Sequence, residues 1–329
     1  MERFALAAAV VLGFALTAAL CSLFVPLRRV LERREQQQQP VQSEQPRPAP
    51  LRAPLWGGLC AAAGTVAAVG VGWLAACVGQ PELRFEEDAL RMFRAIRFSA
   101  RLGFEIEPET EAAIVKKAPL AAALAAERIR DEVEKILLTK RPEKLLELIQ
   151  AGLLDRCLIR RLTGDALLRR LSVLPKKALP RWAAFCRILE QGGCIRSTEE
   201  FLLSLRLDSR TIRCCTDCGK ILEEKPPETS VEWKRLLSRK GVDTVTCAAQ
   251  CGDALYGGRR GKALKAVLKS GECFSMKHLA VTGDDLLALG IHGRQLGEML
   301  KFLLDYVMEY PENNRRELLL SLARCSEEN

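Results

Sequence analysis

The sequence predicts an all-α protein in which a two-helix transmembrane hairpin precedes a long series of amphipathic helices. Apolar residues recur at the helical period from residue 84 onward, and no stretch alternates apolar and polar residues for long enough to form a sheet. Hydrophobic residues make up 48% of the 329 residues but aromatic residues only 5%, which is typical of a helical core built from Ala and Leu. Two long runs without charged residues, both before residue 82, predict the hairpin.

The predicted hairpin consists of transmembrane helices at residues 1–27 and 53–81, joined by a polar loop at 28–52. Phe4–Leu27 and Ala53–Pro81 carry no charge, and a bilayer core of ~30 Å is crossed by about 20 helical residues. The loop is rich in Arg, Gln and Pro, which is typical of a disordered or extended segment. A secretory signal peptide at the first run, or a buried Ala- and Gly-rich helix pair in a soluble protein, are the alternative interpretations.

The charge of the chain favours an anionic partner, either a nucleic acid or a membrane surface, since the formal net charge is +9 at pH 7. Arginines occur both in the polar loop and directly after the second run, and the positive-inside rule places either group in the cytoplasm. We expect the C-terminal part in the cytoplasm and the protein in the inner (cytoplasmic) membrane. The 13 cysteines are scattered and odd in number, which indicates reduced thiols.

The stretch Arg84–Pro108 predicts an amphipathic helix that ends at Gly103, with Pro108 opening the next helix. Its apolar stripe comprises Ala89, Met92, Phe93, Ile96 and Ala100, and its charged side comprises Glu87, Asp88, Arg91, Arg94, Arg97 and Arg101. Asp88 and Arg91 are three residues apart, so a carboxylate and a guanidinium can lie side by side. A solvated charged face is the alternative interpretation.

This stretch, together with the following RAIRFSARLGFEIEPET, resembles the neck motif of bacterial class II tRNA nucleotidyltransferases, the CCA-adding enzymes, and their poly(A) polymerase relatives. The resemblance implies that a Glu-Asp-x-x-Arg motif at Glu87, Asp88 and Arg91, with the adjacent Arg94, binds the incoming nucleotide. Asp88 and Arg91 would pair with the base edge, because a carboxylate accepts from an exocyclic amine and a guanidinium donates to ring nitrogen and carbonyl oxygen.

Two further blocks resemble the same family. ERIRDEVEKIL is similar to the block that supports the neck helix, which implies a structural role for Glu127, Arg128 and Glu132; charge pairs on an exposed helix are the alternative. LAVTGDDLLALGIHGRQLGEMLKFLLDYVMEYPENN is similar to the tail that reaches the outer corner of tRNA. The resemblance therefore implies an RNA-binding neck at 82–155, a helical body at 156–265 and a tRNA-binding tail at 266–329.

Basic pairs recur through the predicted body, and they suit contact with a phosphate backbone, which makes binding salt-sensitive. The candidate RNA-binding residues are Arg160, Arg161, Arg169, Arg170, Lys176, Lys177, Arg259 and Arg260. Solvated surface is the alternative interpretation for any single pair.

The carboxylates needed for nucleotidyl transfer are not evident. In the family, a catalytic head precedes the neck and supplies a Gly-Gly turn and an Asp-x-Asp pair that holds two magnesium ions. This sequence has no aspartate before Asp88 and no Asp-x-Asp pair. We therefore expect no head, no catalytic residue, no metal and no cofactor in this chain, with Mg²⁺ and CTP or ATP entering only if a separate chain supplies a head.

Four cysteines offer a possible zinc site, in Cys215-x-x-Cys218 and Cys247-x-x-x-Cys251. The first pair lies in a predicted helix, the spacing within the second pair is loose for a zinc site, and Cys214 would compete with Cys215 as a ligand. We therefore expect buried thiols without metal.

The sequence thus predicts a membrane-tethered, tRNA-binding member of the CCA-adding family that is catalytically incomplete alone. One alternative is half of a two-chain tRNA nucleotidyltransferase, with tRNA and a head chain as partners. Another is a membrane-anchored interaction module whose RNA surface has been reused or lost. A join of two reading frames near Gln80 is a further interpretation.

Overall fold

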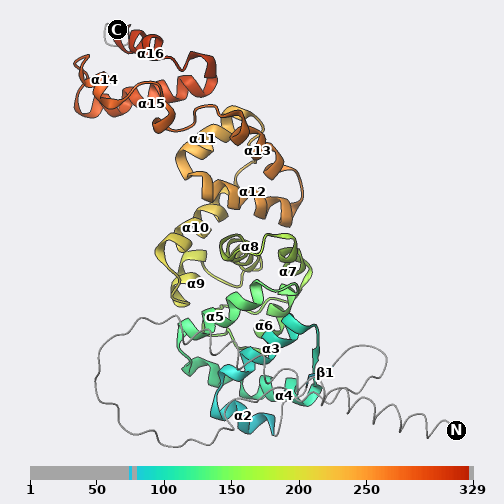
Figure 1. Ribbon diagram of the computed structural model, residues 1–329. Coiled ribbons are helices and arrows are strands. Elements are labelled where there is room, and N and C mark those ends of the chain that lie inside the picture. Colours follow the sequence, from blue (N-terminus) through green and yellow to red (C-terminus); the bar gives the residue numbers. More distant parts are fainter. Residues whose placement is uncertain (1–73, 76–79, 326–329) are drawn as a thin grey trace, which may run out of the picture. The chain divides into compact units, whose positions relative to one another are not determined.

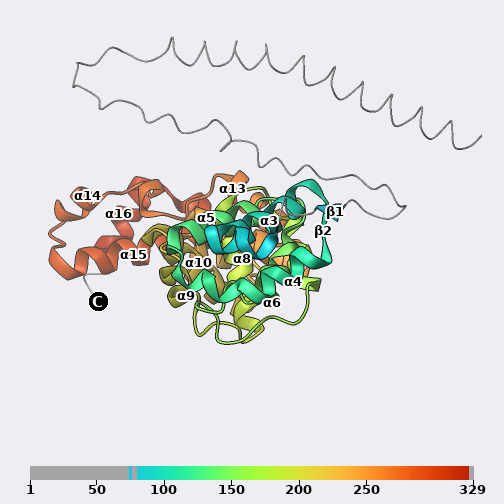
Figure 2. The same cartoon turned by 90° about the horizontal axis from the view of Figure 1, so that it is seen from below.

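The computed structural model describes residues 74–75 and 80–325, and the regular elements of these residues are helices apart from one pair of short strands (Figure 1). Strand β1 (Leu74–Ala75) pairs in parallel with β2 (Glu105–Ile106), with Leu74 opposite Glu105. The two strands lie side by side in Figure 2. The predicted all-α character is therefore confirmed for the described residues, with this small addition.

The predicted transmembrane hairpin is wrong. Over the described part of the chain, no helix combines the length and the apolar character needed to cross a membrane. The predicted helix 1–27 and loop 28–52 lie outside the described residues, as does most of 53–81. Where that last segment is described, it contains strand β1 and the proline that begins a new helix, not a continuous apolar helix. The predicted location in the inner membrane rested on the hairpin and is wrong with it.

The first group of helices follows the proline and glycine signals of the sequence. Prolines at N1 begin α2 and α4, where the missing N–H costs no hydrogen bond. Gly103 ends α3 in the left-handed region at φ 83°, a conformation that favours glycine. The elements are α2 (Pro81–Glu87), α3 (Leu90–Leu102), α4 (Pro108–Lys117), η1 (Ala118–Ala123), α5 (Ala126–Leu137), η2 (Pro142–Lys144) and α6 (Leu145–Ala151).

The following helices begin at side-chain caps. Ser197, Asp208 and Thr229 each accept a hydrogen bond from an N–H of the first turn that they precede. The elements are α7 (Ala166–Arg170), η3 (Leu171–Val173), α8 (Ala178–Gln191), α9 (Thr198–Ser204), α10 (Ser209–Glu223), α11 (Ser230–Lys240), α12 (Val242–Tyr256) and α13 (Arg260–Ser270). The last group comprises η4 (Met276–His278), α14 (Gly283–Leu287), α15 (Gly293–Glu309), η5 (Pro311–Asn313) and α16 (Arg316–Cys325).

Three apolar cores lie inside the described residues. The largest extends from Phe85 in α2 to Leu255 in α12, so the neck helices share one core with α7 to α10 and one side of α12. A second core joins α11, the other side of α12 and α13 around Trp233. The third begins at Cys273 and holds α14, α15 and α16 together.

Arg181 of α8 is a buried cation that joins separate elements of the largest core. Its side chain is 1% exposed. The guanidinium donates to the carbonyl oxygens of Thr139 at 2.7 Å and Leu174 at 3.0 Å, and also to that of Leu137. These carbonyls lie at the end of α5 and beside η3, so one side chain fixes three elements and satisfies acceptors that would otherwise be buried without partners.

Candidate nucleotide and RNA interface

The stretch predicted as one helix is interrupted at Asp88. Asp88 has an extended backbone with φ −150° and ψ 100°, and it separates α2 from α3. Its Oδ1 accepts from the N–H of Leu90 at 3.1 Å, and its carbonyl accepts from the N–H of Arg91 at 3.0 Å. Asp88 therefore caps α3 by an Asx-type turn, and the prediction that Asp88 and Arg91 lie one turn apart on a continuous helix is wrong.

Glu87 positions Arg91 at this junction. Arg91 Nη1 lies 2.6 Å from Glu87 Oε2 and also donates to the carbonyl of Arg84 at 3.1 Å. Hydrogen bonds from Arg91 and then from Arg84 lower the pKa of Glu87 below its ordinary value. Glu87 is thus ionised at neutral pH, and its side chain holds one guanidinium nitrogen of Arg91 while the rest of that group stays partly exposed.

The Asp88 carboxylate is only loosely paired within the protein. Its Oδ2 lies 3.8 Å from Arg94 Nη1, and its Oδ1 lies 3.8 Å from Arg128 Nη2 of α5. The side chain of Asp88 is 26% exposed, and both arginines are more exposed still. The junction therefore presents an accessible acceptor beside three guanidinium donors, an arrangement that can pair with a planar polar edge.

A buried charge pair lies behind this junction and joins α3 to α5. Arg97 Nη1 lies 3.1 Å from Glu132 Oε2, and Lys135 Nζ lies 3.2 Å from Glu132 Oε1. Glu132 is 4% exposed at its side chain, so two cations compensate its charge in place of water. Of the three residues assigned to support, Arg128 and Glu132 contact the junction or its helix, whereas Glu127 is exposed in the first turn of α5.

The basic pairs of the body differ in how they are used. Arg161 makes a two-pronged pair with Asp155, Arg169 pairs with Asp165, and Arg170 donates to the carbonyl of Leu255 at 2.5 Å. Arg260 is half-buried over the ring of Tyr256 and packs against Gly252. Four candidates stay exposed without an ion pair among the described residues, namely Arg160, Lys176, Lys177 and Arg259.

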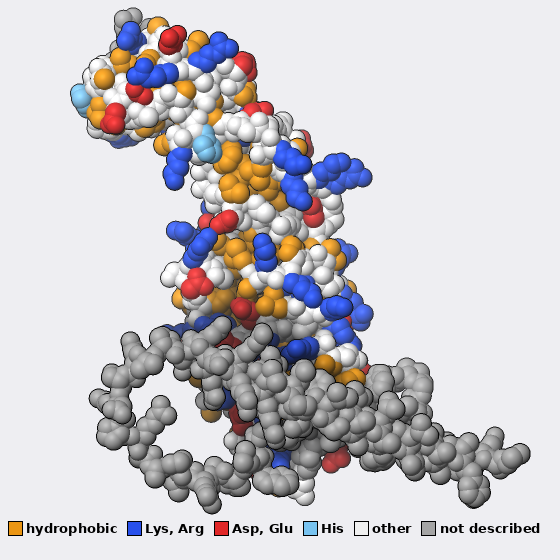
Figure 3. Space-filling view, viewed as in Figure 1, with side chains coloured by type: hydrophobic (Ala, Val, Ile, Leu, Met, Phe, Trp, Pro, Cys, Tyr) orange, Lys and Arg blue, Asp and Glu red, His pale blue; other side chains and the backbone are white. Residues whose placement is uncertain are grey.

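Three lysines that sequence reasoning missed extend this surface. Lys262, Lys265 and Lys269 are exposed on α13, at spacings of three and four residues that place them on one side of the helix. This helical spacing of three lysines can be seen in the sequence and could have identified them. Lys262 and Lys265 line an open groove of about 460 Å³ between η3, α12 and α13. In Figure 3, Lys and Arg side chains gather along the side that carries α7 and α13, at the right of the view.

Comparison with known proteins identifies the family. A family model described as the probable RNA and SrmB- binding site of polymerase A matches residues 103–158. The CCA-adding enzyme of Lactiplantibacillus plantarum is 32% identical over 268 residues, which cover 75% of this chain and 62% of that protein. The structure of the Bacillus stearothermophilus CCA-adding enzyme in complex with CTP is similar with a TM-score of 0.63 at 28% identity, over 78% of this chain and 67% of that one.

The chain belongs to the CCA-adding enzyme and poly(A) polymerase family. It spans 62% of the length of the Lactiplantibacillus plantarum CCA-adding enzyme, less than two thirds. The Thermotoga maritima CCA-adding enzyme complexed with tRNA shares its fold, with a TM-score of 0.50 at 21% identity over 77% of this chain and 64% of that one. The matched RNA-binding region includes Glu127, Arg128 and Glu132, and it begins after the nucleotide candidates from Glu87 to Arg94.

Proposed function

We propose that this member of the CCA-adding family binds tRNA through its basic helical surface and reads the base of an incoming nucleotide with Asp88 and Arg91. The observation that supports the second part most directly is the α2–α3 junction. There, an accessible carboxylate lies beside arginines, and Glu87 holds Arg91 at 2.6 Å. The CTP-bound and tRNA-bound relatives support the choice of ligands.

The chemistry of the junction favours cytosine and adenine over guanine and uracil. Cytosine and adenine both present an exocyclic amine donor next to a ring-nitrogen acceptor. A carboxylate can only accept, and a guanidinium can only donate, so Asp88 and Arg91 match this pair of groups. Guanine and uracil present a carbonyl where the amine would be, and that carbonyl would face the carboxylate of Asp88 without a proton between them.

Transfer of a nucleotide requires metal-bound carboxylates, and we propose that these come from outside residues 80–325. Within the described residues, Glu87 is closely paired with Arg91, Asp88 lies at 3.8 Å from Arg94, and the only group of three metal-binding side chains is formed by cysteines. Mg²⁺ and CTP or ATP would then act only where such carboxylates are supplied. A two-chain nucleotidyltransferase, in which a second polypeptide supplies them, is the second candidate.

The RNA-binding part of this proposal is tested with the full chain and a tRNA that lacks its 3′ end, titrated at several salt concentrations. The logarithm of the affinity should fall linearly with the logarithm of salt. Replacing both Lys176 and Lys177 by Gln should reduce the slope by about 1.4 to 1.8, at ~0.7 to 0.9 for each phosphate that the protein no longer neutralises. Arg161→Gln is the matched control, because Asp155 already occupies that guanidinium. An affinity that does not change with salt contradicts RNA binding.

The catalytic part is tested by incorporation of labelled CTP and ATP into the same tRNA with Mg²⁺. We expect tRNA binding without incorporation by the full chain alone. Incorporation by the chain alone would show that the metal-binding carboxylates are present in it, and would contradict a requirement for a second polypeptide.

A further inference from the structure

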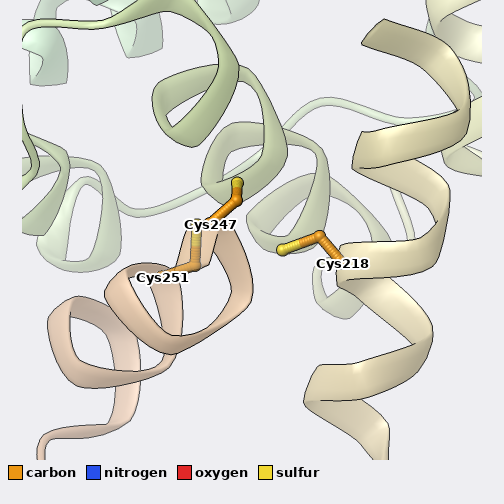
Figure 4. A group of neighbouring side chains, drawn as sticks. All are labelled: Cys218, Cys247 and Cys251. Atoms are coloured by element: carbon orange, nitrogen blue, oxygen red, sulfur yellow. The ribbon is translucent and has the colours of Figure 1, made fainter. Parts of the chain in front are cut away.

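Three buried cysteines meet where α12 packs against α10. Cys218 comes from α10, and Cys247 and Cys251 lie one turn apart on α12. Their sulfur atoms all lie within 4.8 Å of one another, and the three residues are no more than 3% exposed. In Figure 4 the side chain of Cys218 points toward α12, and the thiols of Cys247 and Cys251 lie on the side of α12 that faces it.

The geometry suits three-coordinate binding of a metal ion. Three sulfurs at ~2.3 Å from a central ion, spread at about 120°, are about 4 Å apart. Sulfur atoms within 4.8 Å of one another reach that arrangement by shifts of less than about 1 Å, which side-chain torsions can supply. Structural zinc takes four protein ligands, and Cys215, although buried nearby on α10, is not part of the group.

We propose that Cys218, Cys247 and Cys251 form a binding site for a soft monovalent metal ion, with Cu(I) as the best fit, that joins α10 to α12. Thiolates are the ligands that Cu(I) prefers in proteins, and this group contains no oxygen or nitrogen donor. The sequence led us to expect that the four candidates are buried thiols without metal, whereas the fold brings together three of the four and leaves Cys215 outside the group.

Binding must displace the thiol protons, because the thiolate is the form of cysteine that ligates a metal ion. In the metal-free structure, Cys251 Sγ donates to the carbonyl oxygen of Pro180 at 3.3 Å, and this hydrogen bond breaks when the ion binds. For each cysteine that meets the ion as a thiol, one S–H bond breaks, one Cu–S bond forms and one proton passes to solvent, without any change of oxidation state. Affinity should consequently fall as the pH decreases, since protons compete with the ion for the sulfur atoms.

The test uses the reduced full chain under anaerobic conditions, with Cu(I) supplied from a chromophoric chelator that competes for the ion. We expect a site of equimolar stoichiometry with thiolate-to-metal charge-transfer absorption. Cys218→Ala should weaken it at least 100-fold, and Cys251→Ala should do the same. Cys273→Ala is the matched control, because Cys273 is also buried but belongs to the core of the last helices. Its affinity for Cu(I) should equal that of the unmodified chain.

Thermal melting separates loss of the site from loss of the fold. Cu(I) should raise the melting temperature of the unmodified chain and of Cys273→Ala, and should leave that of Cys218→Ala unchanged. Three results would overturn the proposal: no equimolar site in the folded, reduced protein; equal Cu(I) affinity in folded Cys218→Ala; or tight Zn(II) binding without Cu(I) binding. Oxidation of two of these thiols to a disulfide in a protein that binds no Cu(I) would also contradict it.

Discussion

In the proposed function, Asp88 combines a structural and a recognition role, and two substitutions separate these roles. Its Oδ1 caps α3 by accepting from Leu90 N–H at 3.1 Å, while its negative charge lies 3.8 Å from Arg94 and from Arg128. Asp88→Ala removes both features. Asp88→Asn keeps a side-chain oxygen for the Leu90 amide and removes only the charge, because asparagine caps helices about as well as aspartate does.

The structure sets the expected magnitudes. Loss of the cap in Asp88→Ala should cost ~1 kcal/mol of local stability. The two ion pairs should add less than ~0.5 kcal/mol each, because both distances are long and both arginines are close to half exposed. A loss of about 1.4 kcal/mol corresponds to a tenfold increase in local opening. Hydrogen exchange of the Leu90 and Arg91 amides should therefore accelerate about tenfold in Asp88→Ala and less than about fivefold in Asp88→Asn.

Nucleotide choice should respond differently from stability. Asp88→Asn can turn its amide N–H₂ toward the base, which replaces an acceptor with a donor and should abolish any preference of the full chain for CTP over UTP. Equal acceleration of amide exchange in both variants would refute the capping argument. A preference for CTP that persists in Asp88→Asn would refute base reading by this carboxylate.

Three further substitutions test separate parts of the fold. Arg181→Met should lower the free energy of unfolding by ~3 kcal/mol, because it strands buried carbonyl groups, and Arg181→Lys should not restore it; the urea midpoint measures both. Arg316, followed by Thr282, lowers the pKa of Asp285 from 3.8 to about 2, so the stabilisation by ionised Asp285 is complete above about pH 4 and is lost as the pH falls toward 2. Asp285→Asn should therefore remove the acid-dependent increase in amide exchange of α14. Gly152→Ala should lower the melting temperature, because Gly152 has φ 86° and an added Cβ would lie 2.4 Å from a guanidinium nitrogen, whereas Gly164→Ala meets open space and should not.

The helical elements could be predicted because their signals are local. Gly103 ends α3 and Pro108 begins α4, as the sequence indicated, since a left-handed C-cap and a fixed φ are properties of single residues. The break at Asp88 was missed because an aspartate inside a helical period fits either a charged helix face or an Asx turn. Only the extended backbone, with Oδ1 accepting from Leu90, distinguishes the two.

The roles of the arginines could not be read from the sequence, because they depend on which acid the fold brings near. Arg161 follows Arg160 directly, yet Arg161 folds back onto Asp155 while Arg160 stays exposed. The turn at Gly152 brings Arg161 back to the carbonyl of Gln150. Two adjacent arginines in a sequence do not reveal such a turn. The apolar run before Pro81 led to a wrong prediction for a similar reason. Its lack of charge predicted a membrane helix, whereas its described part contains a strand.

Helix α5 contacts the α2–α3 junction and is itself part of the region that matches the RNA-binding family model. Arg128 at its start lies 3.8 Å from Asp88, and Glu132 one turn later holds Arg97 of α3 in a buried pair. α5 also lies within residues 103–158, the matched region. A shift of α5 relative to α3 would separate Arg97 from Glu132, and this is costly because the carboxylate of Glu132 is only 4% exposed. Such a shift would also change the distance between Arg128 and Asp88. In the proposed function, the position of bound RNA and the shape of the base-reading junction are therefore coupled through the Arg97–Glu132 pair.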